Sequence, residues 1–238
     1  KPVYGVYSTF VQRPYDQLQQ DLCINNNPIT ILTFAASVWG MNDVTHLGIY
    51  DIPMMSNIPN LVYLAPTTYE EYIAMLDWST EQREHPVAIR VPGAVIHGEK
   101  PTKDYGILNK YETVQKGSGA AIIALGTFFD MGKQAAELIK KKTGVKPTLI
   151  NPVYITGIDE ELLESLKKDH KAVVTLEDGI LDGGFGEKIA RFYGDSDMRT
   201  VNFGLKKEFL DRYDANEVLR QNCLTPEQIA DRAAELIK

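Results

Sequence analysis

Residues 7–17 read Tyr7-Ser8-Thr9-Phe10-Val11-Gln12-Arg13-Pro14-Tyr15-Asp16-Gln17, and they follow directly on the apolar run Val3–Tyr7. The run is typical of a β-strand, and Pro14 is tolerated only in the first turn of a helix, so a helix is expected to start near residues 9–13. The stretch therefore predicts a strand-to-helix turn. Strand ends of this kind are where open α/β sheets bind ligands. The first strand is expected at an edge of its sheet, or beside strands that the chain lacks.

The same alternation of apolar runs and helical patterns continues along the chain, and most of the runs lack a regular polar spacing. Near-continuous apolar strands are typical of parallel sheets covered by helices on both faces, which predicts the α/β class with two parallel-sheet units. Thr67 and Glu70 predict a capping box, Gly144 a helix stop, and Pro226 the first position of the last helix. The expected strands are Ile29–Phe34, Leu61–Ala65, Val87–Val91, Ala120–Leu125, Pro147–Ile150, Ala172–Leu176 and Thr200–Phe203.

A polar stretch with glycine and proline, residues 99–106, has the composition of a linker. It divides the chain into a first segment, 1–98, and a second, 107–238. The second segment reads as a complete α/β unit, whereas the first reads as part of one.

Composition excludes several classes of function. The 238 residues carry a net charge of −7, which argues against a nucleic-acid binder but leaves room for local arginines to hold an anionic substrate. Cys23 and Cys223 stand alone, and no two histidines have ligand spacing, so neither a disulfide framework nor a protein-ligated metal is expected. No apolar run approaches the length of a membrane span and no signal peptide is recognisable, so a cytoplasmic protein is the simplest interpretation.

Two aromatic residues and a cation recur at a spacing of three in the first stretch: Tyr7, Phe10 and Arg13. Aromatic rings beside a guanidinium bind flat heterocycles by stacking and by cation–π contacts. The alternative is that Phe10 belongs to the core and Arg13 is solvated. On residue types alone the alternative is favoured.

Other candidates follow predicted strands. His46 lies in the polar stretch Asn42–His46, where it is either a proton donor and acceptor or an ordinary surface histidine. Arg90 lies inside an apolar strand, so it is either part of a buried ion pair or an anion-binding group. The glycine-rich turn 183–186 could cradle phosphate, but tight packing of a strand on a helix is the better interpretation.

With these residues in view, the chain resembles the C-terminal part of the 1-deoxy-D-xylulose 5-phosphate synthase family, within the transketolase group of thiamine diphosphate enzymes. The resemblance runs nearly end to end, and as an ordered series it is more specific for the group than for the synthase. Its motifs are residues 7–17, Thr45-His46-Leu47-Gly48-Ile49-Tyr50-Asp51, Ile58-Pro59-Asn60-Leu61, Ala65-Pro66, Arg90-Val91-Pro92, Val174-Thr175-Leu176-Glu177-Asp178, Gly183-Gly184-Phe185-Gly186 and Phe203-Gly204-Leu205.

The resemblance implies roles for these residues. Tyr7, Phe10 and Arg13 would contact the aminopyrimidine ring of thiamine diphosphate, and His46 would face the reactive thiazolium carbon and assist proton transfers. Residues 1–98 would form a partial pyrimidine-binding domain, and residues 107–238 the transketolase C-terminal domain. The family reaction joins pyruvate to glyceraldehyde 3-phosphate with loss of carbon dioxide, and homodimers are expected.

The resemblance also implies limits. The diphosphate and Mg²⁺ site, and the glutamate that activates the pyrimidine, would lie before Lys1, so the chain alone is expected to be inactive. Ala35 and Gly93 stand where the synthases carry arginines, and Asn42 where they carry aspartate, which leaves Arg90 and Asn42 as candidates for acceptor binding. The alternatives are a transketolase, a 2-oxoacid dehydrogenase β subunit, and a non-catalytic paralogue or assembly module.

Overall fold

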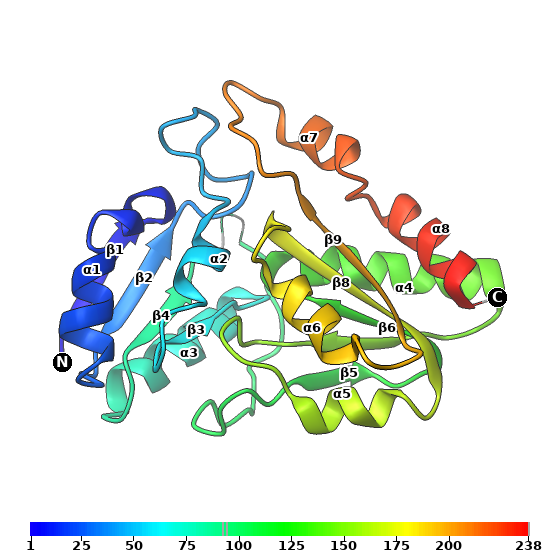
Figure 1. The fold of residues 1–238 in the computed structure, drawn as a ribbon, viewed down its shortest axis with the longest axis horizontal. Coiled ribbons are helices and arrows are strands. Elements are labelled where there is room, and N and C mark those ends of the chain that lie inside the picture. The colour runs from blue at the N-terminus through cyan, green and yellow to red at the C-terminus, as the bar shows by residue number, and fades with distance from the viewer. Residues whose placement is uncertain (92, 94, 238) are drawn as a thin grey trace.

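The computed structural model describes residues 1–91, 93 and 95–237 and shows two sheets side by side, each with its own helices (Figure 1). Pro92, from the Arg90-Val91-Pro92 motif, and Lys238, the last residue of the expected second unit, lie outside the described residues. The α/β class predicted from the sequence is confirmed.

The first sheet has four parallel strands in the order β1-β2-β4-β3. The first strand lies at an edge, as the sequence predicts. It leads into a 3₁₀ helix and then into a short α-helix that continues as a π-helix, so the expected strand-to-helix turn is present. The elements are β1 (Val3–Tyr7), η1 (Ser8–Gln12), α1 (Tyr15–Gln17), η2 (Leu18–Cys23), β2 (Thr30–Phe34), α2 (Asp51–Met55), β3 (Val62–Leu64), α3 (Tyr69–Glu81) and β4 (Val87–Arg90).

The second sheet has five strands in the order β5-β7-β6-β8-β9. Its edge strand β5 is antiparallel to β7, so the sheet is mixed, and this strand is absent from the sequence prediction. The reason is local: β5 reads Glu-Thr-Val-Gln, with only one strongly apolar residue. The elements are β5 (Glu112–Gln115), β6 (Gly119–Ala124), η3 (Gly126–Phe128), α4 (Phe129–Thr143), β7 (Thr148–Asn151), α5 (Glu160–Leu166), β8 (His170–Ile180), α6 (Phe185–Tyr193), β9 (Arg199–Leu205), α7 (Ala215–Gln221) and α8 (Pro226–Ile237).

Helix ends follow the local chemistry of the sequence with one exception. Gly144 ends α4 with a φ of 75°, a left-handed conformation that suits glycine, and α8 begins at Pro226. The predicted capping box is wrong by one residue. Thr68 caps α3 by accepting the Glu71 N–H, while the Glu71 carboxylate accepts from the main chain and hydroxyl of Thr67.

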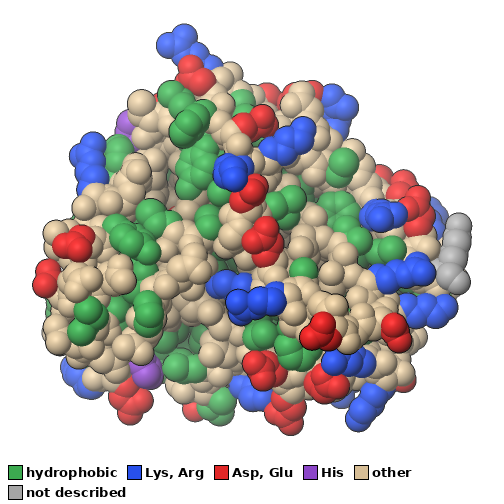
Figure 2. Space-filling view, viewed as in Figure 1, with side chains coloured by type: hydrophobic (Ala, Val, Ile, Leu, Met, Phe, Trp, Pro, Cys, Tyr) green, Lys and Arg blue, Asp and Glu red, His purple; other side chains and the backbone are tan. Residues whose placement is uncertain are grey.

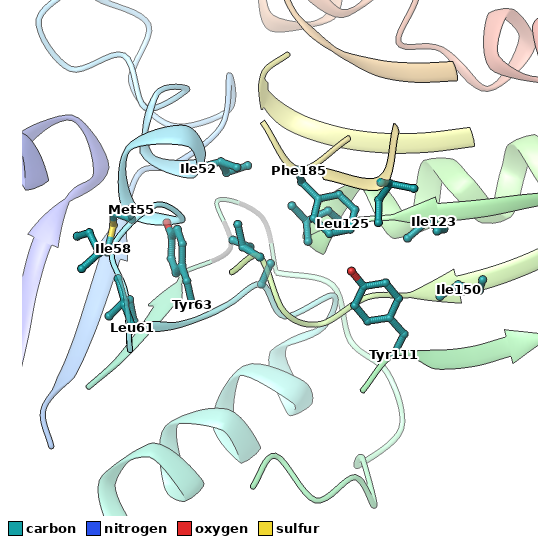
Figure 3. Packing of buried hydrophobic residues seen from close by; sticks show 14 of the residues in the cluster. Ile52, Met55, Ile58, Leu61, Tyr63, Tyr111, Ile123, Leu125, Ile150 and Phe185 are labelled. Carbon is teal, nitrogen blue, oxygen red and sulfur yellow. The ribbon is translucent and has the colours of Figure 1, made fainter. Parts of the chain in front are cut away.

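One apolar core joins the two units. In Figure 3, Ile52 points toward Phe185 and Leu125 of the second unit, and Tyr63 and Met55 lie farther into the first unit. All five side chains are buried and belong to one cluster. Main-chain hydrogen bonds cross the same junction, from Ile155 N–H to the Tyr63 carbonyl at 2.7 Å and from Ala65 N–H to the Val153 carbonyl at 2.8 Å. The units are therefore held together by a shared interior as well as by the covalent connection.

The connecting segment, residues 95–108, contains no helix or strand. It is not wholly exposed, because Tyr105 is buried and its carbonyl accepts a hydrogen bond from the Tyr154 hydroxyl. Acidic and basic side chains are interspersed over the face shown in Figure 2. None of the helices in the described part of the chain is both long and apolar enough to cross a membrane.

Candidate active site

Four predicted site residues come together at the end of β1. The Phe10 ring lies 5.1 Å from the His46 ring and 6.2 Å from the Tyr7 ring, measured between centroids, and the Arg13 guanidinium lies 4.8 Å from the Phe10 centroid. Tyr7 also approaches His46, at 6.3 Å. We call these four residues the aromatic cluster.

The aromatic cluster is open to solvent. Tyr7 is 47% exposed, Arg13 is exposed, and Phe10 and His46 are half-buried. Phe10 is therefore not a core residue, and Arg13 contacts a ring although it is solvated. An exposed set of ring faces with one cation can receive a flat heterocycle, and the neighbouring imidazole can exchange a proton with it.

His46 is carried by a loop, residues 38–47, whose base is closed by an isolated bridge between Ser37 and Gly48. Ser37 N–H donates to the Gly48 carbonyl at 2.7 Å. The turn before the loop is strained, since Ala35 and Ser37 have φ values of 52° and 80°. Gly48 passes so close to the Ala35 carbonyl that a Cβ would lie 2.2 Å from it, which explains why glycine follows Leu47 here.

A carboxylate and a hydroxyl face the imidazole of His46. Nδ1 lies 3.1 Å from Asp43 Oδ1 and 2.8 Å from Thr45 Oγ1. Hydrogen bonds from Thr45 and His46 lower the pKa of Asp43 to about 2, so Asp43 is a carboxylate at neutral pH. Nothing in the sequence singled out Asp43, although the spacing of three residues in a tight turn could have drawn attention to it.

The far end of this loop is fastened by the second unit. Asp211 Oδ1 accepts from Val44 N–H at 3.2 Å, Arg212 N–H donates to the Asn42 carbonyl at 2.6 Å, and the Tyr213 hydroxyl donates to the Val38 and Met41 carbonyls. Figure 1 shows the two segments beside each other at the top of the molecule. Sequence reasoning missed residues 211–213, because their partners lie about 170 positions away.

Asn42, predicted as a substrate-binding residue, is exposed in this loop. It lines a hollow of about 510 Å³ between residues 38–43 and residues 213–215. The main chain of Asn42, through its carbonyl, makes the contact with Arg212.

Arg90, the other predicted substrate-binding residue, lies apart from the aromatic cluster in a buried ionic cluster with Asp51 and Asp178. Its exposed fraction is 6%, and those of Asp51 and Asp178 are 1% and 2%. Arg90 Nε donates to Asp51 Oδ2 at 2.7 Å and Nη2 donates to Oδ1 at 3.2 Å, while Nη1 donates to Asp178. Of the two interpretations that the sequence left open, the structure displays the buried ion pair.

The buried ionic cluster links the two units, because Asp51 lies in α2 and Asp178 in β8. Burial lowers the pKa of Arg90, but the charges of Asp178 and Asp51 outweigh it, so the net direction is upward. Arg90 Nη2 also approaches the Gly48 carbonyl at 3.4 Å, at the base of the His46 loop. Gly93 lies nearby and shares a small hollow with Arg90 and Asp178.

Glu177, next to Asp178, occupies the N-terminus of α6. Its carboxylate accepts from Phe185 N–H and Gly186 N–H, each at 2.8 Å, and a Cβ on Gly184 would lie 2.5 Å from its Oε2. Burial raises the pKa of Glu177 to about 8, against the opposite effect of those two donors. The glycine-rich turn therefore packs a strand against a helix, and the N–H groups of Phe185 and Gly186 donate to a carboxyl group of the protein itself.

Within the described residues, no group of three or more His, Cys, Asp or Glu side chains is arranged to hold a metal ion.

Two family models match the chain. The transketolase pyrimidine binding domain matches residues 1–95, and the transketolase C-terminal domain matches residues 109–229. The chain belongs to the transketolase family. Each match falls on one of the two units, and the segment between the matches overlaps the connection that has no helix or strand.

Two curated relatives with high similarity are synthases. The chain is 36% identical over 243 residues to 1-deoxy-D-xylulose-5-phosphate synthase of Clostridium perfringens (strain SM101), covering 100% of this chain and 39% of that protein. It is 33% identical to the Clostridium tetani protein of the same name, covering 100% and 38%. The chain thus spans about two fifths of the length of these relatives.

Solved structures share the fold. A split-gene transketolase, described as an inactive beta4 tetramer, superposes with a TM-score of 0.84 at 21% identity, covering 100% of this chain and 77% of that one. A Pichia stipitis transketolase in complex with sedoheptulose-7-phosphate superposes with a TM-score of 0.78 at 18% identity, covering 99% and 34%.

Proposed function

We propose that this chain is part of a thiamine diphosphate-dependent carboligase that joins pyruvate to glyceraldehyde 3-phosphate, giving 1-deoxy-D-xylulose 5-phosphate and carbon dioxide. The observation that supports it is the aromatic cluster, in which Tyr7, Phe10, Arg13 and His46 meet at one open strand end. The names of the curated relatives agree with the proposed reaction.

The residues present suit the pyrimidine end of the cofactor. Tyr7 and Phe10 offer accessible ring surface, and a planar ring placed against them would gain stacking energy of about 0.5–1.5 kcal/mol per aromatic partner. Arg13 lies over one face of Phe10, where its guanidinium can donate to electron-rich atoms of a bound pyrimidine. These side chains bind and orient, and they exclude water from one face of the ring.

His46 is proposed to move protons on the substrate. When bound, thiamine diphosphate supplies a nucleophilic carbon and an electron sink, and the protein supplies orientation and electrostatics. An imidazole at the mouth of the aromatic cluster can take a proton from a substrate hydroxyl and return it later.

The diphosphate and Mg²⁺ are proposed to be held by a region that corresponds to the other three fifths of the synthase relatives. We propose that the chain alone does not turn over, and that the active form is a homodimer of the complete protein. The description of one structural neighbour as an inactive tetramer agrees with the first part of this proposal.

Carbon dioxide release from pyruvate tests the function. The complete gene product that contains this chain is assayed with thiamine diphosphate and Mg²⁺, with and without glyceraldehyde 3-phosphate. Release that the aldehyde stimulates, with a five-carbon product, supports the proposal. Absence of release under both conditions contradicts it.

A second candidate is ketol transfer between sugars. The resemblance implies that Ala35 and Gly93 stand where the synthases carry arginines, and Arg90 is already engaged by Asp51 and Asp178, so these positions supply no free guanidinium for the synthase acceptor. A transketolase ignores pyruvate, so turnover of ketose phosphates without pyruvate would replace the first proposal. A 2-oxoacid dehydrogenase β subunit would release carbon dioxide without an aldehyde. A non-catalytic paralogue would be inert toward all of these substrates.

His46→Ala gives the sharpest test of the proton-transfer role. In the complete protein we expect kcat to fall by roughly 10²- to 10⁴-fold, the usual contribution of a general acid–base group, while cofactor affinity stays nearly constant. His97→Ala is the matched control, because His97 also faces a carboxylate, that of Glu70, but lies outside the aromatic cluster. Unchanged turnover in His46→Ala removes the residue from the mechanism.

A further inference from the structure

We propose that Asp43 is a positioning residue that, together with Thr45, fixes the tautomer of His46, so that Nδ1 carries the proton and Nε2 carries the lone pair. Only the effect of this tautomer on catalysis rests on the proposed role of His46. The tautomer itself follows from contacts within the loop.

The hydroxyl proton of Thr45 is donated to Asp43. Thr45 Oγ1 lies 2.5 Å from Asp43 Oδ1, and Thr45 N–H donates to the same oxygen at 3.0 Å. A carboxylate can only accept hydrogen bonds, so the hydroxyl must donate its single proton to Asp43. Thr45 Oγ1 then has only lone pairs left for any other neighbour.

The second step concerns the imidazole. Nδ1 of His46 faces Thr45 Oγ1 at 2.8 Å and Asp43 Oδ1 at 3.1 Å. Both oxygens are acceptors in this arrangement. A bare Nδ1 would place its lone pair against two other sets of lone pairs, whereas a protonated Nδ1 donates to both. Nδ1 therefore bears the hydrogen, and in the neutral ring Nε2 is the proton acceptor.

The main chain keeps the three residues in this geometry. His46 N–H donates to the Asp43 carbonyl at 3.1 Å, which closes a tight turn over residues 43–46. Val44, inside the turn, is bound through its N–H to Asp211 of the second unit at 3.2 Å. The turn thus selects Nε2 as the ring nitrogen that can accept a proton. A histidine held in one tautomer is not partly populated in the other, unproductive one.

The tautomer is measured directly by ¹⁵N NMR of the histidine rings in the chain, at an alkaline pH where imidazoles are neutral. We expect His46 to show a protonated Nδ1 and a bare Nε2. In Asp43→Ala the Thr45 hydroxyl is free to donate to Nδ1, so the Nε2–H form should appear. Thr45→Val keeps the Asp43 acceptor and should keep the Nδ1–H form, and the His97 signals serve as an internal reference in all three proteins.

Two results would overturn the inference: a dominant Nε2–H form in the unmodified chain, or an Asp43→Ala spectrum of His46 that matches it. In the complete protein, Asp43→Ala should lower kcat about tenfold or more with little change in KM, since a wrong tautomer impairs proton transfer and not binding. If His46 shows the Nδ1–H tautomer but the complete protein has no thiamine-dependent turnover, the positioning by Asp43 stands and the proposed function is refuted.

Discussion

The aromatic cluster and the buried ionic cluster each contain an arginine, and one of these arginines is exposed while the other is buried. Arg13 is exposed and rests on the face of Phe10, whereas Arg90 is 6% exposed and is held by two carboxylates that are themselves buried. The sequence marked both as candidates for ligand binding.

The difference separates two uses of a cation. A guanidinium over an exposed ring contributes about 0.5–1 kcal/mol, so a ligand can rearrange the contact at little expense. Two buried carboxylates that share one guanidinium cannot lose it without leaving their charges uncompensated in the interior. The open cluster is therefore suited to an exchanging ligand, and the buried one to holding α2 and β8 together.

Removal of the Arg90 charge should give the largest effect. Arg90→Met leaves Asp51 and Asp178 buried without their partner, and we expect the free energy of unfolding to fall by about 3–5 kcal/mol. Urea denaturation measures it. Arg220→Met is the control, because Arg220 makes a surface pair with Glu217 and its loss should hardly change stability. If Arg90→Met is as stable as Arg220→Met, Arg90 contributes no more to stability than an exposed arginine does.

Glu177→Gln should give a smaller effect that depends on pH. The pKa of Glu177 is raised from 4.5 to about 8, so the folded protein retains a proton that the unfolded chain has lost. Its contribution to stability is full below pH 4.5 and disappears as pH rises to about 8. The variant should lack this decline, so its stability relative to the parent should rise with pH.

The neighbours of Glu177 set the range for that measurement. Asp178 raises its pKa and Arg90 lowers it, while burial lowers the pKa of Lys188 to about 8. Unfolding is therefore compared between about pH 5 and about pH 7.5, below the Lys188 transition. Glu187→Gln, an exposed change in the first turn of the same helix, should follow the parent protein. If the stability of Glu177→Gln also changes with pH in the same way as that of the parent, the Glu177 carboxyl is ionised in the folded protein.

Tyr7→Ala should give the smallest effect on stability and a selective one on binding. Because the ring is 47% exposed, the free energy of unfolding should change by about 0.5 kcal/mol or less. Loss of one stacking partner should weaken thiamine diphosphate binding in the complete protein by about 2- to 12-fold. Tyr4→Ala, in the same strand and 41% exposed, is the matched control. If Tyr7→Ala and Tyr4→Ala bind the cofactor with equal affinity, Tyr7 does not contact it.

Much of the fold could be predicted from the sequence, because parallel strands buried on both faces leave long apolar runs. β6 and β8 were recognised in this way. The edge position of β1 was one of the two alternatives expected for that strand. β5 was missed because an edge strand with alternating exposure needs few apolar residues. The Thr67 box was misplaced by one position, since Thr68 and Glu71, one residue later, have the same spacing.

The site was predictable where its residues are close in sequence or share a motif. Tyr7, Phe10 and Arg13 lie close in sequence, from the end of β1 to the end of η1. The resemblance added His46, although residue types alone favoured a core Phe10 and a solvated Arg13. The carboxylate partners of Arg90 could not be found, because Asp51 and Asp178 lie 39 and 88 positions away. Contacts at such separations are set by packing, which no local pattern records.

The fastening of the His46 loop has a consequence for how such a protein can diverge. The loop offers main-chain atoms to the second unit: the carbonyls of Val38, Met41 and Asn42 and the N–H of Val44. Side chains there can be exchanged without loss of a single one of these bonds. The side chains of the loop can therefore change while residues 211–213 keep its course past His46. A graft of the loop alone into another protein would carry its side chains but not the main-chain contacts that hold it.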